Sequence, residues 1–411
     1  MKTIVLDDDP TGTQSATGVR VLLEHDTELI TDALRDTGSV YVQTNSRALH
    51  EADAVALVRR IRREGEEAAA RLGVEVRFVL RGDSTLRGHV FAETEQFLDG
   101  DAVMLFVPAF PDGGRTTRGG MHYVKVDGTD VPAHESEYAR DPVFPFASGI
   151  LAEYVAEKSQ RTAVPVGLDD VRAGRLAEVL RTAPAGSVVL PDAVVTADIE
   201  AIAAAANAVD RTVVVRSGAP LAAALAGVSS PRLLDRPLLT EPAPVLLVCG
   251  SHTAGATTQL DEVLRSHGPA EIVGTTAALD DPATEGKTTA GRARARLAAD
   301  GLAIVASERT REQDHGTLDH GEKIMTALTT AVAELLPAVD VIVAKGGITS
   351  AEVARTGAGA RSALVLGQVL PGVSVWRMTA RDGREITYVV VPGNVGGPDT
   401  LVSVLDALGA R

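Results

Sequence analysis

The sequence has little cysteine, few aromatic residues and no long apolar run. Cys249 is the single cysteine among 411 residues, so the chain cannot close a disulfide within itself. A membrane-spanning helix needs about 20 consecutive apolar residues, and no stretch approaches that length. The first residues pass from a short apolar run straight into three aspartates, unlike a signal peptide. We therefore expect a soluble cytoplasmic protein with no membrane partner.

Basic residues are also in the minority. Lys and Arg number 40 against 55 Asp and Glu, which gives a formal net charge of −15. Dedicated nucleic-acid binders normally carry a basic face, so we expect no nucleic-acid partner. Aromatic residues contribute only 3% of the chain, whereas hydrophobic residues contribute 45%. Cores built from Ala, Val and Leu favour helices packed on a parallel sheet, whose buried strands are short apolar runs.

Short apolar runs alternate with helical patterns along most of the chain, which predicts largely parallel sheets flanked by helices. A chain of 411 residues exceeds what one hydrophobic core usually supports. A proline-rich stretch without periodicity at residues 231–244 marks a linker. The expected fold class is therefore α/β, with one domain at residues 1–235 and a second at residues 245–411. Strands are expected at residues 3–6, 40–43, 76–80, 103–107, 163–166, 187–190, 212–215, 245–248, 271–273, 302–305 and 339–344.

The first polar cluster is LDDDPTGTQ at residues 6–14, directly after the first predicted strand. In open α/β sheets, ligands bind beyond the carboxyl ends of the strands. Packing three carboxylates together is costly unless a metal, a cation or a substrate hydroxyl shares the site. The alternative is an acidic turn in which Thr11 or Thr13 caps a helix. The position after a buried strand favours the functional interpretation.

A second cluster, RGDSTLRGH at residues 81–89, also follows a predicted strand. Arginine offers a planar fork for a carboxylate or phosphate, while Asp83 and the neighbouring hydroxyls suit sugar hydroxyls. An N-cap with an internal Asp–Arg ion pair is the structural alternative. Two weaker elements are TNSR at residues 44–47, which contributes Arg47, and the Gly- and Pro-rich loop at residues 107–124, which contributes Arg115.

Glycine-rich turns gather in the C-terminal part, at residues 249–259, 345–350 and 392–399. The first two follow a predicted strand and enter a helix. Backbone N–H groups in such turns cradle phosphate without a cationic side chain. A single turn is weak evidence, because glycine also serves tight turns that bind nothing. Several such turns in one domain predict a nucleotide site.

Together these motifs resemble the four-carbon acid sugar kinases, a family that includes D-threonate, D-erythronate and 3-oxo-tetronate kinases. The resemblance spans nearly the whole chain, and the set is far more specific than any single motif. The matching positions are residues 8–9, 11–12, 83–88, 108–111, 114–115, 250–251, 346–350, 393–394 and 396.

The resemblance implies an N-terminal domain that binds the acid sugar and a C-terminal domain that binds ATP with Mg²⁺. It assigns no metal ligand, and it leaves open which acid is used and whether the chain forms a homodimer. Arg81 stands where the family often has lysine, a change that bears on the identity of the acid. The implied ATP contacts are Ser251, Gly346, Gly347, Ile348, Thr349, Gly393 and Asn394.

The expected reaction is phosphoryl transfer from ATP to a hydroxyl of a small sugar acid, which requires mainly positioning and charge stabilisation. Asp8 is the preferred catalytic residue, with Asp83 as the second candidate, to orient or deprotonate the acceptor hydroxyl. The active site is expected in a cleft between the domains, whose closure would exclude water. The residues expected to bind the substrate are Asp9, Arg47, Arg81, Ser84, Arg87 and Arg115.

Two other functions stay open. Asp7, Asp9 and Thr11 fit the Asp-x-Asp-x-Thr nucleophile loop of a haloacid-dehalogenase-like phosphatase. Arg87, however, stands where the later magnesium-binding aspartate of such an enzyme would fall. A non-catalytic protein that binds a sugar acid or nucleotide would keep the glycine turns but tolerate loss of the acidic motif, which is intact here. ATP consumption that depends on a sugar acid would separate a kinase from both.

Overall fold

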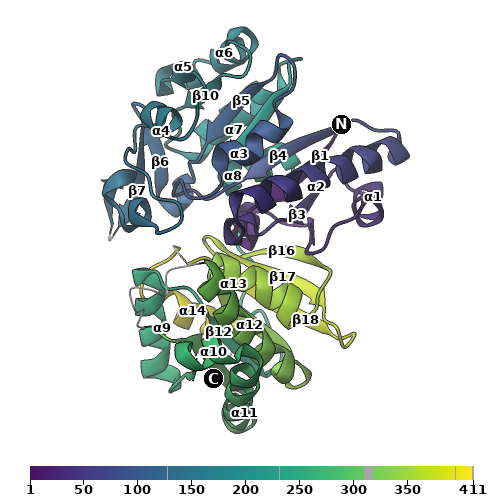
Figure 1. The fold of residues 1–411 in the computed structure, drawn as a ribbon, viewed down its shortest axis with the longest axis vertical. Coiled ribbons are helices and arrows are strands. Elements are labelled where there is room, and N and C mark those ends of the chain that lie inside the picture. The colour runs from purple at the N-terminus through teal and green to yellow at the C-terminus, as the bar shows by residue number, and fades with distance from the viewer. Residues whose placement is uncertain (127, 231, 310–317, 394, 410–411) are drawn as a thin grey trace. The chain divides into compact units, whose positions relative to one another are not determined.

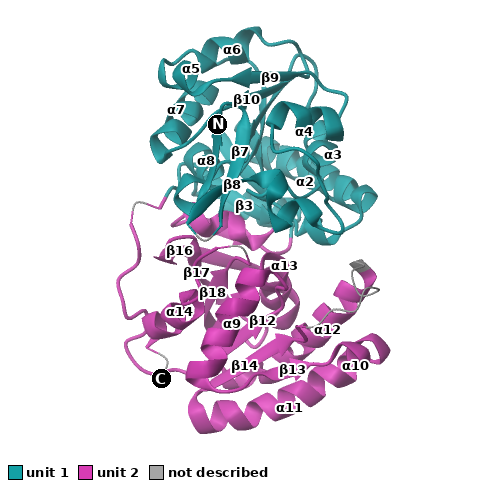
Figure 2. Ribbon diagram, turned by 90° about the vertical axis from the view of Figure 1, so that its left-hand side faces the viewer, with its two compact units in different colours: residues 1–8, 25–229 teal, residues 9–24, 230–411 magenta. Residues whose placement is uncertain are grey.

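The computed structural model describes residues 1–126, 128–230, 232–309, 318–393 and 395–409. The chain divides into two compact units, which Figure 2 shows in different colours. Unit 1 comprises residues 1–8 and 25–229, and unit 2 comprises residues 9–24 and 230–411. The chain therefore leaves unit 1 within the acidic motif, contributes a short segment to unit 2 and then returns. Among the described residues, no helix is both long and apolar enough to span a bilayer.

Unit 1 is built on a parallel sheet with the strand order β3-β1-β4-β11-β5-β10-β9. Its central strands are short runs of buried Val, Ile and Leu, as expected for a sheet covered on both faces. The strands are β1 (Lys2–Asp7), β3 (Ser39–Gln43), β4 (Val76–Arg81), β5 (Val103–Val107), β9 (Ala163–Val166), β10 (Val188–Pro191) and β11 (Val213–Ser217). Because these strands are parallel, their carboxyl ends lie at one edge, where Asp7 is in register with Gln43 and Arg81.

Helices cover both faces of this sheet (Figure 1). Successive side chains of a strand point to opposite faces. Thr3 of β1 donates to the Leu225 carbonyl of α8 at 3.4 Å, whereas Ile4 lies so close to Gly65 of α2 that a Cβ there would come within 2.7 Å of it. The α/β class is thereby confirmed. The helices are α1 (Thr27–Arg35), α2 (Glu51–Leu72), α3 (Val90–Thr94), α4 (Leu151–Lys158), α5 (Leu168–Arg172), α6 (Leu176–Thr182), α7 (Thr196–Asn207) and α8 (Ala219–Ala226).

A small antiparallel sheet forms where the sequence predicted an irregular loop. It consists of β6 (Arg115–Arg118), β7 (Met121–Val126) and β8 (Thr129–Pro132). Gly119 and Gly120 connect β6 to β7, and their φ angles of 59° and 74° are those of a two-residue hairpin turn. The Asp192 carboxylate accepts both of their N–H groups, at 2.7 and 3.0 Å. The glycines that suggested a loop are therefore the turn of a hairpin.

Unit 2 contains a mixed sheet with the strand order β13-β14-β12-β15-β18-β17-β16-β2. The strands from β13 to β18 in that order are parallel, and β17, β16 and β2 extend the sheet in antiparallel fashion. The sequence predicted β12, β13, β14 and β15, but it predicted neither β18 nor the antiparallel strands β17, β16 and β2. The strands are β2 (Arg20–Leu22), β12 (Val245–Cys249), β13 (Glu271–Val273), β14 (Leu302–Ser307), β15 (Val341–Lys345), β16 (Ser362–Leu370), β17 (Val373–Thr379) and β18 (Glu385–Val391).

The core of unit 2 lies between this sheet and its helices. Side chains of β12 and β15 pack with those of α9 and α14 in one buried apolar cluster, while α11 and α12 contact β14. The helices are α9 (Ala254–His267), α10 (Thr275–Asp280), α11 (Pro282–Asp300), α12 (Leu318–Leu335), α13 (Gly347–Glu352) and α14 (Thr400–Leu408).

Buried hydrogen bonds fasten residues 9–24 to the antiparallel part of unit 2. The Trp376 indole N–H donates to Thr13 Oγ1 at 2.9 Å, and the same hydroxyl lies 2.9 Å from Ser374 Oγ. Further along, β2 pairs with β16. These long-range contacts place the segment in unit 2, although the sequence around it is continuous with unit 1.

Candidate functional site

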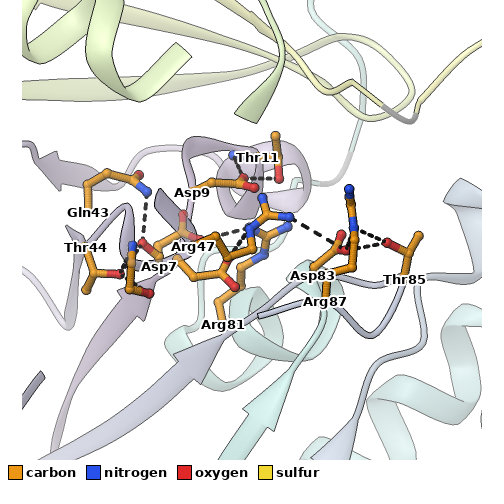
Figure 3. Close-up of polar contacts among 12 residues, drawn as sticks. Asp7, Asp9, Thr11, Gln43, Thr44, Arg47, Arg81, Asp83, Thr85 and Arg87 are labelled. Atoms are coloured by element: carbon orange, nitrogen blue, oxygen red, sulfur yellow. Dashed lines mark hydrogen bonds and ion pairs between the residues drawn. The ribbon is translucent and has the colours of Figure 1, made fainter. Parts of the chain in front are cut away.

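The strand ends of unit 1 bring together the acidic motif and the arginine-rich motifs. Asp7 at the end of β1 is in register with Arg81 at the end of β4, and Arg81 is in register with Ser217 of β11. Asp8 and Arg216 lie beside this row of residues. Figure 3 shows the resulting network, in which Arg47 and Arg87 point toward Asp83. The parallel topology therefore assembles one charged cluster from four separate strands.

Asp8 is surrounded by guanidinium groups. Its Oδ1 lies 3.2 Å from Nη1 of Arg81 and 3.7 Å from Nε of Arg47. Its Oδ2 accepts from Nη2 of Arg216 at 3.2 Å. Only 2% of the side chain is exposed. Both carboxylate oxygens are therefore fixed in orientation, which is the property that a residue positioning a reacting hydroxyl requires.

Asp83 is a second buried carboxylate in the same cluster. Its Oδ2 accepts from the Thr85 hydroxyl and from Nε of Arg87 at 2.8 Å, and it lies 3.6 Å from Nη1 of Arg47. Burial alone would raise the pKa of Asp83, but the guanidiniums of Arg87 and Arg47 hold it well below its usual range. Asp83 is thus a firmly ionised carboxylate, which suits it to holding cations and hydroxyls.

Asp7 is more deeply buried than Asp8 or Asp83. Its side chain has no exposed surface, and Oδ1 lies 3.2 Å from Nη1 of Arg81. Burial raises the pKa of Asp7 to about 7, with Arg81 opposing the shift and Asp8 adding to it. Burial thus favours the protonated form of Asp7.

The remaining predicted substrate residues lie around this cluster. Arg115 is 4% exposed and interacts electrostatically with Tyr138 and Asp83, and burial lowers its pKa. Ser84 is buried next to Asp83. Asp9, by contrast, belongs to unit 2, where its Oδ1 accepts the Thr11 N–H at 2.8 Å and caps a short 3₁₀ turn. The cap that the sequence assigned to a threonine is thus supplied by Asp9.

Sequence reasoning missed Arg216 and Glu93. Nη1 of Arg216 donates to Glu93, and both side chains are almost fully buried. A Cβ on Gly82 would come within 2.6 Å of the Arg216 guanidinium, so the glycine provides the space in which that group reaches Asp8. A weak signal existed in the sequence, because Arg216 follows an apolar run, but that run does not show which strand lies beside it.

His122 supports the Asp83 motif from the hairpin, and sequence reasoning did not single it out. It is fully buried, with Nε2 2.8 Å from the Ser84 carbonyl and Nδ1 3.0 Å from Thr117 Oγ1. Burial lowers the pKa of His122 to about 4, so the ring is neutral. A carbonyl can only accept, which places the proton on Nε2 and makes the Thr117 hydroxyl the donor to Nδ1.

In unit 2 the predicted glycine turns meet around Ser251. A Cβ on Gly346 would lie 2.9 Å from Ser251 Cβ, and a Cβ on Gly393 would lie 2.7 Å from Ser251 Oγ. Gly250 is equally close to Thr349, whose Oγ1 would be 2.4 Å from an added Cβ. The backbones thus approach one another as a phosphate cradle requires. Asn394 lies outside the described residues.

The other predicted ATP contacts open α13, a helix that begins directly after Gly346. Gly347, Ile348 and Thr349 form its first turn, and Ile348 is 36% exposed. Before them, Lys345 is fully buried and donates from Nζ to the Pro392 carbonyl at 2.6 Å. Burial lowers the pKa of Lys345 to about 7. This lysine links two of the glycine turns and was not assigned from the sequence.

Metal ligands are not grouped in the part of the chain that the structure describes: no set of three or more His, Cys, Asp or Glu side chains could hold an ion. Mg²⁺ does not need such a set. It is usually held by substrate phosphates, water and one or two carboxylates, which agrees with the residues present.

Two family models cover most of the chain. The model described as a sugar-binding N-terminal domain matches residues 3–225, and the model described as a nucleotide-binding C-terminal domain matches residues 246–401. The first match contains the Asp8–Asp83 cluster and the second contains the turns around Ser251. Each group of predicted site residues therefore lies within one of the two matched domains.

Curated relatives carry the same kinase names. The chain is 30% identical to a D-threonate kinase of Bordetella bronchiseptica, over 92% of this chain and 88% of the relative. It is 28% identical to a D-threonate kinase of Salmonella typhimurium, over 98% of both chains. A D-erythronate kinase of Heliobacterium modesticaldum is 32% identical over 59% of this chain and 54% of that relative.

The fold is also found among solved structures. A crystal structure of a Haemophilus influenzae protein superposes with a TM-score of 0.62 at 19% identity, covering 98% of this chain and 100% of that one. A likeness at this identity concerns the fold alone. It shows that the arrangement of these strands and helices occurs in a protein of the same extent.

Proposed function

We propose a function from one premise: this chain belongs to the four-carbon acid sugar kinase family, and it carries both the sugar-binding and the nucleotide-binding domain. The proposed reaction is transfer of the γ-phosphoryl group of ATP to a hydroxyl of a small sugar acid. D-threonate and D-erythronate are the first substrates to consider, because the relatives are named for them.

One observation carries the proposal, namely that Asp8 is held between Arg81 and Arg216 at the strand ends of unit 1. In the reaction the acceptor oxygen bonds to the γ-phosphorus, the bond from that phosphorus to the β,γ-bridging oxygen breaks, and ADP leaves. The proton of the hydroxyl passes to the Asp8 carboxylate. A loose transition state requires little basicity, so an oriented carboxylate between cations is sufficient.

The substrate carboxylate would be bound by arginines of the same cluster. Arg87 and Arg47 lie on either side of Asp83, and Arg115 is buried beside them. A planar guanidinium can bind a carboxylate through two parallel hydrogen bonds. Asp83, being ionised, would accept hydrogen bonds from the sugar hydroxyls. The acid is therefore recognised at both its charged and its hydroxylated ends.

The nucleotide would bind in unit 2, at the turns that converge on Ser251. Small residues there let backbone N–H groups reach the phosphates. Mg²⁺ would supply charge neutralisation for the phosphates when bound. Transfer requires the sugar acid and ATP to meet, so the proposal includes the cleft between the domains that the sequence predicted.

The test is ATP consumption with Mg²⁺ against the D and L forms of threonate and erythronate and against the 3-oxo-tetronates. Turnover that appears only with one of these acids supports the kinase and identifies its substrate. ATP consumption that is independent of any acid, or release of phosphate from phosphorylated acids without ATP, would overturn the proposal in favour of an ATPase or a phosphatase. ATP binding without turnover on any acid would favour the non-catalytic alternative.

A further inference from the structure

Arg309 lies just beyond the end of β14, next to the turns around Ser251. Its Nη1 donates to the Ser251 carbonyl at 2.6 Å and lies 3.7 Å from Cys249 Sγ. Its Nη2 donates to Ser307 Oγ at 3.1 Å. Every acceptor in this set is uncharged. Sequence reasoning gave Arg309 no role.

The charge of Arg309 is not balanced by a carboxylate within the described residues. The adjacent Glu308 accepts the Thr275 N–H at 2.9 Å instead. Nε of Arg309 is buried and donates to no acceptor in the described part of the chain. A partly desolvated cation without an anion costs free energy. Such a cation is stable where a ligand supplies the negative charge.

A second basic side chain lies close by, and burial lowers its pKa to about 7. Lys345 ends the strand on the other side of β12, and it too contacts only a neutral acceptor, the Pro392 carbonyl at 2.6 Å. Cys249 ends β12, the strand between them, and burial raises the pKa of its thiol, so it supplies no negative charge. Two basic side chains, at the end of β15 and just beyond β14, therefore lie beside the glycine turns, and Arg309 is the one that stays charged. An anion is the ligand that this edge of the sheet would attract.

We propose that Arg309 binds the phosphate chain of the nucleotide directly, as the charged side of the cradle formed by the turns around Ser251. This inference rests on the proposed kinase function. Lys345 cannot take this role, because it is fully buried and committed to Pro392. Arg309 is only partly buried, and its planar guanidinium can bind two phosphate oxygens at once.

A purely structural role for Arg309 would be to brace the Ser251 carbonyl. The two roles differ in how affinity depends on phosphate. A brace supports the whole turn, so its loss weakens every adenine nucleotide equally. A phosphate ligand contributes only where phosphates are present, so its loss removes the advantage of ATP over adenosine. Binding along the series adenosine, AMP, ADP and ATP therefore separates them.

The experiment is calorimetric titration of the full chain with this series, for wild type, Arg309→Met and Arg309→Lys. Arg309→Met should lose about 10- to 100-fold in ATP affinity, the loss expected for charge-assisted hydrogen bonds, with adenosine affinity unchanged. Arg309→Lys, which keeps the charge and most of the packing, should lose less. Arg296→Met is the matched control, because Arg296 already pairs with Asp300 at 3.2 Å on the surface of the same unit.

The possible failures are distinguishable. If wild type binds none of the series, the proposed nucleotide site is wrong and the inference falls with it. If wild type binds ATP and Arg309→Met binds it equally well, the inference alone is overturned. If Arg309→Met loses the same factor of affinity for adenosine as for ATP, the inference is also overturned, and Arg309 is a brace for the Ser251 carbonyl. If Arg309→Met does not fold, the affinities of Arg309→Lys for adenosine and for ATP are compared with those of wild type in the same way.

Discussion

Nη2 of Arg216 lies 3.2 Å from Oδ2 of Asp8, which joins two residues that are 208 positions apart in the sequence. The other side of the guanidinium donates to Glu93, so Arg216 is fixed between two buried carboxylates. Gly82 leaves the space that this arrangement needs. The orientation of the proposed catalytic carboxylate therefore depends on residues of β11, of α3 and of the loop after β4.

Adding one methyl group at Gly82 should disturb this arrangement. The Cβ of Gly82→Ala would lie 2.6 to 2.9 Å from three atoms of the Arg216 guanidinium, which must then move away from Asp8. We expect a fall in kcat of about 100-fold, because small misplacements of a reacting group cost that much. The free energy of unfolding should decrease by about 1–3 kcal/mol.

The matched control is Gly167→Ala, since an added Cβ there meets no atom within 4 Å. It should leave both kcat and stability close to wild type. Steady-state kinetics and urea unfolding of the two variants provide the comparison. If Gly82→Ala retains full kcat, then Asp8 does not need Arg216 in its present position, and the account of the site is wrong on this point.

How far this network could be predicted from the sequence depends on the residue. The ends of β5, β9 and β13 agree exactly with the predicted strands, because apolar runs between polar loops define strands well. The clustering of Asp8 with Asp83 followed from the rule that parallel strand ends share an edge. Arg216 was out of reach, because its contact depends on β11 lying next to β4 in the sheet, and periodicity does not determine strand order.

Unit 2 was predicted less completely for a related reason. Strand β17 pairs antiparallel with both β16 and β18. No local sequence pattern predicted this change of strand direction. Residues 9–24 lie in unit 2 because of long-range contacts such as Trp376 with Thr13. A search for one linker along the chain cannot detect a segment that crosses between units and returns.

Replacing His122 by leucine should weaken binding of the sugar acid. The change removes the donor to the Ser84 carbonyl and the acceptor of the Thr117 hydroxyl, so two buried polar groups lose their partner. We expect a loss of about 1–3 kcal/mol in stability and a several-fold rise in KM for the acid. The KM for ATP, whose proposed site is in unit 2, should not change. Equal changes in both KM values would show a general loss of structure instead.

Asp7 should make stability depend on pH. Burial raises its pKa to about 7 from 3.8, so the folded protein favours the protonated form. The unfolded chain releases this proton first as the pH rises, and the stabilisation is therefore complete below about pH 4 and lost as the pH rises to about 7. Asp7→Asn, which cannot ionise, should gain about 1.4 kcal/mol per pH unit relative to wild type over that range.

Urea unfolding at several values between pH 4 and pH 8 measures this difference. It should grow with pH and level off above about pH 7. Asp210→Asn provides the control, because Asp210 is exposed on the surface of unit 1. A difference between Asp7→Asn and wild type that stays constant with pH would mean that Asp7 is ionised throughout, as a partner of Arg81.

Thr13→Val tests the attachment of residues 9–24 to unit 2. The variant leaves the Trp376 indole N–H and the Ser374 hydroxyl without their shared partner, which should cost about 1–3 kcal/mol of stability. Trp376 is the only tryptophan of the chain, so its fluorescence reports the change directly. Thr258→Val removes an exposed hydroxyl of α9 and should alter neither signal. An unchanged emission spectrum in Thr13→Val would contradict the contact.

The most direct test of the kinase assignment is to measure ADP and phosphorylated acid together, by ³¹P NMR, in a reaction with ATP, Mg²⁺ and the active sugar acid. The account predicts that the two products appear in equal amounts, and that Asp8→Asn binds ATP as wild type does but forms both products about 10²- to 10⁴-fold more slowly. ADP formed without phosphorylated acid, or wild-type rates of both products in Asp8→Asn, would contradict it.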